Sequence, residues 1–224
     1  MILSVDYCYQ FSLKLIRKNQ AGPFSNIDFQ YQWNDASSAY QDDLLGRFQA
    51  NNNGKSGLNT GLIENETILT KLNPFTKNTT LLVTVGNATK PDDFVYTLAI
   101  RKGNFQITPI NKNQIYWVLQ NVIDPPSAVD NCYYCIEYEN YYSILPNTVT
   151  EIELDYISSP ENVVWGYTFD ADGRQIYNPG TSKQPQWDAN SCREITKRML
   201  KNLGVSFKDA DFAGFGQSVI KSGE

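Results

Sequence analysis

Residues 149–156 read VTEIELDY, and this stretch indicates which kind of fold the chain adopts. Three acids in it, Glu151, Glu153 and Asp155, alternate with apolar side chains. Successive side chains of a β-strand point to opposite faces of the sheet, so the alternation predicts a strand with one buried face and one strongly negative face. We therefore expect a sheet that covers a core on one side and meets solvent on the other.

Further strand signals lie on both sides of this stretch. They are short runs of β-branched and aromatic residues, which favour strands. One short helix interrupts them, in which Ile115, Leu119 and Val122 share a face before Asp124 and two prolines end it. The predicted strands are residues 81–85, 94–101, 105–110, 133–138, 141–145, 149–156, 163–169 and 174–177.

The sequence between the last two strands, DADG at residues 170–173, has the form of the start of a calcium-binding loop. Such a loop needs a bidentate glutamate at its twelfth position, where this chain has Thr181. We therefore expect a hairpin turn at this point and no metal ion.

Helical patterns begin the chain. Residues 3–19 carry apolar residues without Pro or Gly, and the Gly22-Pro23 turn that follows predicts a helical hairpin. The second helix, residues 26–50, is the clearest in the sequence, and Ser25 with Asp28 forms its cap. Its apolar residues recur at steps of three and four, and they are Phe29, Trp33, Ala36, Tyr40, Leu44 and Phe48.

Helical patterns also end the chain. Asp188 caps a helix that carries Cys192, Ile195 and Met199 and that Gly204 ends. A last helix is predicted to open at Ser206, and its apolar residues are Phe212, Phe215 and Val219.

This order of elements predicts an α+β fold in which the terminal helices bundle beside an antiparallel β-sheet. We expect one domain that spans residues 1–224. Its parts are a helical hairpin (1–50), a loop with a short helix (51–80), a β-rich part with one short helix (81–180) and C-terminal helices (186–222).

The composition excludes most enzyme classes. None of the 224 residues is a histidine, which removes Ser-His-Asp and Cys-His nucleophile pairs and every His-ligated metal site. The four cysteines are scattered, and Cys132 with Cys135 is the only pair with metal or redox spacing. These two cysteines lie on a predicted strand, where residues three apart point to opposite faces and cannot share a ligand. With no histidine and no suitable cysteine pair, we expect no catalytic residue, no metal and no cofactor.

Targeting signals are also missing from the sequence. No stretch approaches the ~20 apolar residues that a membrane-spanning helix needs. No N-terminal segment combines a basic start, a long apolar run and a cleavage site. We therefore expect a soluble protein without an export signal or a membrane partner.

Negative charge is concentrated in one segment. The chain carries 19 Lys and Arg against 24 Asp and Glu, a formal net charge of −5. Residues 121–180 contain ten acids and a single cation, Arg174, which is a balance of −9. Two interpretations stay open: ordinary solvated strand faces, or a surface that must repel polyanions.

A polar stretch follows the second helix. It contains Asn51, Asn52, Asn53, Gly54 and Lys55, and it has too little apolar content to pack. We expect an exposed loop here, and an interaction with a neighbouring protein is a candidate role for it.

Six stretches of the sequence carry a resemblance to one family, and none of them contains a catalytic set. They are RKNQAGPFSNIDFQYQWNDASSAYQDDLLGRFQ (17–49), NPF (73–75), KPDDFVYTLAI (90–100), NVIDPPSAVDNCYYC (121–135), LDYISSPENVVWGYTFDADGRQIYNP (154–179) and QWDANSCREITKRMLKNLGV (186–205). Through these stretches the chain resembles, over nearly its full length, virion structural proteins of crAss-like and related phages of Bacteroidetes.

Members of this family look like ring proteins of the head-to-tail connector, which stack beneath the portal and extend the DNA channel towards the tail. The resemblance therefore implies a non-enzymatic subunit of a closed ring, dodecameric to match the portal. It implies contacts with the portal and with neighbouring connector or tail proteins, and DNA that passes without specific binding. The protein would be made in the cytoplasm of the bacterial host and would end in the neck of the virion.

The resemblance suggests a role for the acids of the negative segment. We expect Glu151, Glu153 and Asp155, or the nearby Asp170 and Asp172, to line or approach the channel, because a wall rich in Lys or Arg would hold DNA by counterion release. The alternative is that these acids face outside solvent.

A tail-associated carbohydrate-binding module is the competing interpretation. The chain contains 14 Tyr, 11 Phe and 4 Trp, and aromatic side chains could line a sugar groove. However, Trp33, Trp117 and Trp187 lie on predicted helices or at their starts, which suits packing better than a sugar-binding platform.

Overall fold

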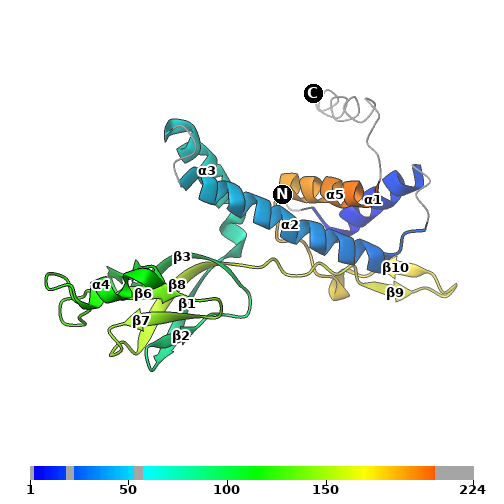
Figure 1. Cartoon of the computed structure of the whole chain (residues 1–224). Helices are drawn as coiled ribbons and strands as arrows, with labels where there is room; N and C mark the ends of the chain where they lie inside the picture. Colours follow the sequence, from blue (N-terminus) through cyan, green and yellow to red (C-terminus); the bar gives the residue numbers. More distant parts are fainter. Residues whose placement is uncertain (1–2, 19–22, 53–57, 205–224) are drawn as a thin grey trace. The chain divides into compact units, whose positions relative to one another are not determined.

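The structure is a computed structural model that describes residues 3–18, 23–52 and 58–204 (Figure 1). Two compact units make up the chain. We name residues 1–71 with 160–224 the helical unit, and residues 72–159 the barrel unit. Helices and a large, mostly antiparallel sheet are both present, as the α+β prediction requires. The prediction of a single domain stays a prediction.

The predicted caps of the helical unit are confirmed. The Ser25 backbone N–H donates to the Asp28 carboxylate (3.0 Å), and the Asp28 N–H donates back to the Ser25 hydroxyl (3.1 Å). Asp188 accepts from the N–H groups of Asn190 and Ser191, and Gly204 ends its helix with φ +72°. The elements of this unit are α1 (Val5–Lys18), α2 (Asn26–Asn52), α3 (Leu58–Leu72), β9 (Tyr167–Phe169), β10 (Gln175–Tyr177), η3 (Pro179–Thr181) and α5 (Ala189–Asn202).

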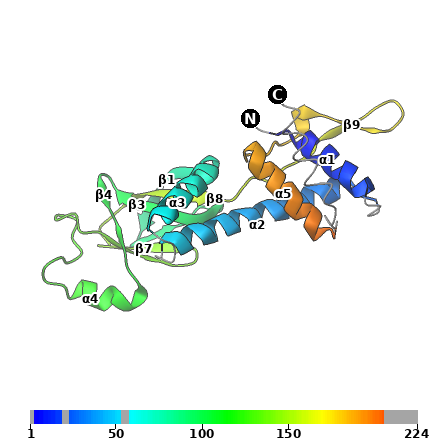
Figure 2. The same cartoon turned by 90° about the horizontal axis from the view of Figure 1, so that it is seen from above.

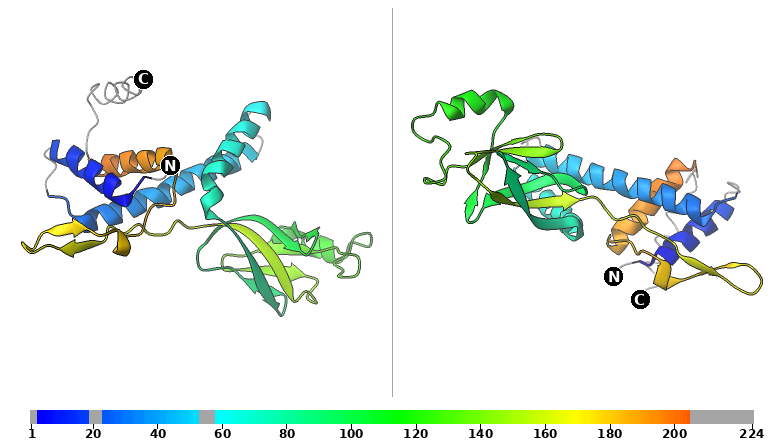
Figure 3. Two further views of the ribbon diagram at one scale, coloured as in Figure 1. Left: turned by 180° about the vertical axis from the view of Figure 1, so that it is seen from behind. Right: turned by 90° about the horizontal axis from the view of Figure 1, so that it is seen from below.

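The core of the helical unit is built around the apolar face of α2. Helix α5 crosses α2 and also contacts α1, as Figures 2 and 3 show. The ring of Tyr40 lies edge-on to Trp187 with centroids 5.2 Å apart, and the Trp187 indole N–H donates to the Ser37 hydroxyl at 2.8 Å. From α1, Tyr9 packs against Phe29. The helical periodicity therefore identified the correct buried face.

The hairpin turn predicted at residues 170–173 is confirmed. Strands β9 and β10 pair as an antiparallel ribbon, and the Asp170 side chain accepts the backbone N–H groups of Asp172 and Arg174. Gly173 adopts φ +75°, a conformation that is costly for residues with a Cβ atom.

The barrel unit is one eight-stranded sheet, in the order β4-β3-β8-β1-β2-β7-β6-β5. All neighbouring strands are antiparallel except β5 and β6, which are parallel. The strands are β1 (Thr76–Thr84), β2 (Asn87–Thr89), β3 (Phe94–Lys102), β4 (Phe105–Gln106), β5 (Thr108–Pro109), β6 (Tyr134–Glu137), β7 (Tyr141–Leu145) and β8 (Glu151–Ser158). The remaining elements are η1 (Asn73–Phe75), η2 (Lys112–Gln114) and α4 (Ile115–Leu119).

Ile107 nearly closes this sheet into a barrel. It is the single residue between β4 and β5, the two outermost strands of the sheet. Its N–H donates to the Ile100 carbonyl on β3 (2.9 Å), whereas the next N–H, that of Thr108, donates to the Tyr133 carbonyl beside β6 (2.9 Å). The prediction of one strand over 105–110 is therefore wrong, because the backbone changes pairing partner at Ile107.

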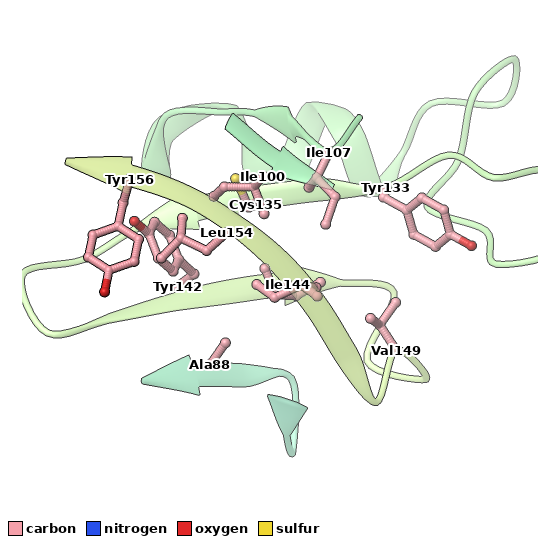
Figure 4. Packing of buried hydrophobic residues seen from close by; sticks show 11 residues of the cluster. Ala88, Ile100, Ile107, Tyr133, Cys135, Tyr142, Ile144, Val149, Leu154 and Tyr156 are labelled. Carbon is pink, nitrogen blue, oxygen red and sulfur yellow. The ribbon is translucent and has the colours of Figure 1, made fainter. Parts of the chain in front are cut away.

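The barrel core follows the alternation seen in the sequence. Ile152, Leu154 and Tyr156 of β8 are buried, and the intervening acids lie on the outer face. Figure 4 shows Ile100 of β3, Ile144 of β7 and Leu154 of β8 within the same interior. The buried cluster comprises Ala88, Ile100, Ile107, Tyr133, Cys135, Tyr142, Ile144, Val149, Ile152, Leu154 and Tyr156.

Other predicted boundaries shift. The strand expected at 81–85 begins five residues earlier, at Thr76, and the strand expected at 163–169 is reduced to Tyr167–Phe169. The first two residues of the expected 51–55 loop, Asn51 and Asn52, form the end of α2. The rest of that loop, Asn53, Gly54 and Lys55, and the helix expected from Ser206 lie outside the described residues.

Candidate functional site

The outer surface of β3 and β8 carries a ladder of opposite charges, which we name the charged face. It consists of Glu151, Glu153 and Asp155 on β8 with Arg101 and Lys102 on β3. Because directly paired residues of neighbouring strands share a face, the pairing of Arg101 with Glu153 places these two side chains on one side of the sheet. Lys102, at the end of β3, reaches the same surface through its ion pair with Glu151. The sequence correctly predicted that the three acids share a face.

Each acid of the charged face has a polar partner. The Arg101 guanidinium lies 2.7 Å from the Asp155 carboxylate and 3.9 Å from that of Glu153. The Lys102 ammonium lies 3.1 Å from the Glu151 carboxylate. The Asn78 side chain on β1 also donates to Asp155 at 2.6 Å. The face is therefore a mixed ladder of three acids and two cations rather than a row of bare carboxylates.

The remaining cations of the barrel unit are also engaged. Lys77 pairs with Asp93 at 2.6 Å, and Lys112 lies 4.2 Å from the centre of the Tyr138 ring. Residues 72–159, all of them described, contain five Lys and Arg against nine Asp and Glu, a net charge of −4. Each of the five cations has a carboxylate or an aromatic ring as its partner.

Lys90 is the most enclosed of these cations. Its side chain is only 8% exposed, and its ammonium lies 2.8 Å from the Glu137 carboxylate. The ammonium also lies 4.3 Å from the Phe94 ring centre and 4.9 Å from that of Tyr142. Burial raises the pKa of Tyr142, whose hydroxyl shares a 2.7 Å hydrogen bond with Thr97. Lys90 therefore has a structural role in the barrel unit, and its enclosed ammonium is not accessible to a polyanion.

The second pair of predicted channel residues lies in the other unit. Asp170 and Asp172 form the turn between β9 and β10 of the helical unit, whereas Glu151, Glu153 and Asp155 belong to the barrel unit. Two backbone N–H groups of the turn donate to one oxygen of the Asp170 carboxylate, and the side chain of Asp172 is exposed.

A second surface of the barrel unit was missed by sequence reasoning. The connection from β5 to β6 contains α4 and the loop after it; we name residues 115–132 the apolar arm, which projects from the strands in Figure 3. Most of its large apolar side chains are turned to solvent, and Trp117 is 78% exposed, Val122 92%, Ile123 87% and Val129 89%. The sequence interpretation that Trp117 packs internally is therefore wrong.

The reason for this exposure is local. Helix α4 has only five residues, the short 3-10 helix η2 leads directly into it, and an irregular loop of bends and turns follows it, so its apolar face does not return to the barrel. The predicted shared face of Ile115, Leu119 and Val122 is broken because the helix ends at Leu119. One signal in the sequence could have revealed the arm: apolar residues surround the Asp124-Pro125-Pro126 break, where no regular element can bury them.

In the barrel unit, all of whose residues are described, Cys132 and Cys135 form no reactive pair. Cys135 is buried in the barrel core, where burial and then the charge of Glu137 raise its pKa to about 12. The Cys132 thiol donates to the Asp130 carbonyl at 3.7 Å. Within residues 3–18, 23–52 and 58–204, no three Cys, Asp or Glu side chains come together as metal ligands would, and no helix is long and apolar enough to cross a membrane.

No family model matches the chain, and no curated protein matches it significantly. The charged face and the apolar arm are therefore interpreted from their own geometry, together with the resemblance carried by the sequence motifs.

Proposed function

We propose that this protein is a non-enzymatic virion structural protein, a ring subunit of the phage head-to-tail connector that extends the portal channel for DNA passage. The observation that carries the proposal is the engagement of every cation in the barrel unit. A protein holds DNA when free Lys and Arg side chains neutralise phosphates and release counterions. The five cations of the barrel unit already have partners and its net charge is −4, so it has few groups that could bind DNA phosphates.

The charged face is the proposed channel-facing surface. Its acids Glu151, Glu153 and Asp155 outnumber its cations, and ion pairs between neighbouring strands restrain both. One excess negative charge repels the phosphate backbone of DNA weakly. Because the cations are held in ion pairs, they do not turn towards the phosphates. The Asp170 and Asp172 turn is proposed as a second acidic approach to the channel.

The finer features of the proposal follow from the sequence motifs. In each subunit the terminal helices bundle beside the antiparallel sheet, and twelve subunits close into a ring. The ring contacts the portal and neighbouring connector or tail proteins, and residues 51–55 are a candidate contact loop. The protein is made in the host cytoplasm and resides in the virion neck.

A tail-associated carbohydrate-binding module is the second candidate, and the aromatic residues of β9 favour it. Tyr167 and Phe169 are both partly exposed on one face of the ribbon, and Trp165 stacks against Tyr167. However, the rings of Tyr167 and Phe169 stand at 86° to each other. Two perpendicular rings do not form the flat platform on which a sugar ring stacks, so this candidate ranks second.

Electron microscopy of the purified protein, together with glycan binding, separates the two candidates. The connector proposal expects closed rings that do not retain double-stranded DNA at low salt. Monomers that bind glycans, with binding lost in Phe169→Ala, would instead support the carbohydrate module. Location is tested by antibody labelling of virions, for which the proposal expects label at the neck and none along the tail.

A further inference from the structure

The apolar arm is ordered although its apolar side chains face solvent. The Asn111 side chain and the Gln114 side chain form a capping box at the start of η2. Beyond α4, Ser127 and Cys132 exchange two backbone hydrogen bonds (3.1 and 2.9 Å), and the Tyr134 hydroxyl donates to the Asp124 carbonyl (3.0 Å). These bonds hold the arm in one shape, and a preorganised surface loses less entropy when it binds.

The size of the exposed area indicates a protein partner. Side chains of this kind bury on the order of 100–200 Å² each, so six of them supply roughly 800 Å², the share of one partner in a standard protein interface. A patch this apolar is typical of permanent contacts between copies of a chain rather than of transient ones. The six side chains are Tyr116, Trp117, Leu119, Val122, Ile123 and Val129.

The helical unit presents a different apolar surface, which we name the hairpin face. Phe169 pairs in register with Gln175, and Tyr167 with Tyr177, so the three aromatic side chains lie on one side of the β9–β10 ribbon. Buried Trp165 of the same unit covers the inner part of this face, with its ring centre 6.0 Å from that of Tyr167 and 5.9 Å from that of Tyr177. Phe169 is 65% exposed and Tyr167 36%, so the end of the face around Phe169 stays open to solvent.

We propose that the apolar arm of one copy docks on the hairpin face of the next copy. This inference rests on the proposed function, because it names the contact that joins neighbouring subunits of the ring. The arm and the hairpin face belong to different units of the chain and differ in shape, so a contact between them is head-to-tail. Repetition of one head-to-tail contact produces a ring when the rotation closes, and every copy then has both of its apolar surfaces covered.

The first test compares self-association of matched variants by light scattering across a concentration series. Trp117→Ser with Ile123→Ser removes arm area, and Phe169→Ser removes the centre of the hairpin face. Each should weaken self-association at least ~100-fold, since central apolar anchors dominate interface energy. The controls Leu82→Ser and Tyr31→Ser change equally exposed side chains, 76% and 74%, and should stay within about 3-fold of the wild type. Circular dichroism verifies that all variants fold.

The second test identifies the contact directly. A photo-crosslinking residue at position 117 is introduced into a mixture of isotope-labelled and unlabelled chains, and mass spectrometry locates the products. The proposal expects crosslinks between two chains, ending within residues 165–177. Crosslinks between copies that end elsewhere would overturn the assignment of the hairpin face.

The outcomes separate this inference from the proposed function. A wild-type protein that stays monomeric at every concentration contradicts both. Wild-type rings that persist in the Trp117→Ser, Ile123→Ser variant contradict the arm contact and leave the connector proposal intact. Rings lost in the arm and hairpin variants, and kept in both controls, support the contact.

Discussion

The guanidinium of Arg101 on β3 lies 2.7 Å from the carboxylate of Asp155 on β8, although its partner in register is Glu153. One cation therefore joins two acids along the strand, since Glu153 lies 3.9 Å away. Strand β3, about fifty positions earlier in the chain, therefore fixes the position of two of the alternating acids of β8. The charged face depends on these ion pairs between β3 and β8.

Charge reversal on this face should make the barrel unit adhere to DNA. In Glu151→Lys with Glu153→Lys, the net charge of the unit rises from −4 to about zero, and Arg101 and Lys102 lose partners. We expect particles that assemble and package DNA but eject it slowly, with the defect relieved by added salt. Ejection kinetics measured on purified particles provide the readout.

A matched control for this prediction is Asp92→Lys with Glu139→Lys, which changes the charge of the same unit equally at two exposed acids. Ejection in the control should match the wild type. Equal slowing in both variants would mean that overall charge matters and that the charged face has no special place in the channel.

Trp33 should be a large contributor to the stability of the helical unit. It is 1% exposed on the apolar face of α2, so Trp33→Ala leaves a cavity and should cost about 3–5 kcal/mol of unfolding free energy. Tyr31→Ala on the exposed side of the same helix should change the free energy by less than about 0.5 kcal/mol. Urea unfolding followed by tryptophan fluorescence and circular dichroism measures both values, and similar losses in the two variants would contradict the packing.

Ile107 should be equally important in the barrel unit. Its side chain is 1% exposed, and its backbone joins the two outermost strands of the sheet. Ile107→Ala should cost about 2–5 kcal/mol because the buried side chain leaves a cavity at the point of closure. Phe105→Ala changes a neighbouring side chain that is 46% exposed and should cost clearly less. Hydrogen exchange of the β4 and β5 amides should rise in Ile107→Ala, and unchanged exchange would argue against its role in closure.

Acid should weaken the contact between α2 and α5. A hydrogen bond from Arg198, at 2.6 Å, lowers the pKa of Asp43, and the charge of Arg47 contributes further. A carboxyl group whose pKa is lower in the folded state stabilises the fold above its unfolded pKa, and this contribution is lost as the pH falls through the folded pKa. Stability should therefore decline below about pH 4.

The variant Asp43→Asn tests this pH dependence. It should be less stable than the wild type near pH 7 by about 0.2–1 kcal/mol, because the pair is partly exposed, and the difference should shrink towards pH 2–3. Unfolding free energies measured between pH 2.5 and 7 give the comparison. Asp42→Asn, at an adjacent exposed acid, serves as the control and should leave the pH profile unchanged. A constant difference across the whole range would contradict the assignment.

Local patterns predicted most of the elements correctly. Helices α1, α2 and α5 lie where periodicity and the caps at Ser25 and Asp188 placed them, and the strands at 94–101, 141–145 and 149–156 were recovered. The predictions failed where a strand is very short or where the backbone changes from one pairing strand to another. The strand β2 has three residues and was missed, and the expected strand at 105–110 is divided by Ile107.

The α+β class, the buried face of α2 and the alternation of β8 were predictable from the chain alone, because each depends on periodicities within a few residues of each other. The near-closure of the barrel at Ile107, the pairing of Asp155 with Arg101 and the exposure of Trp117 became evident in the folded structure. Each of these depends on which distant segments meet. An exposed apolar helix and a buried one have the same local pattern, and only the packing of the rest of the chain distinguishes them.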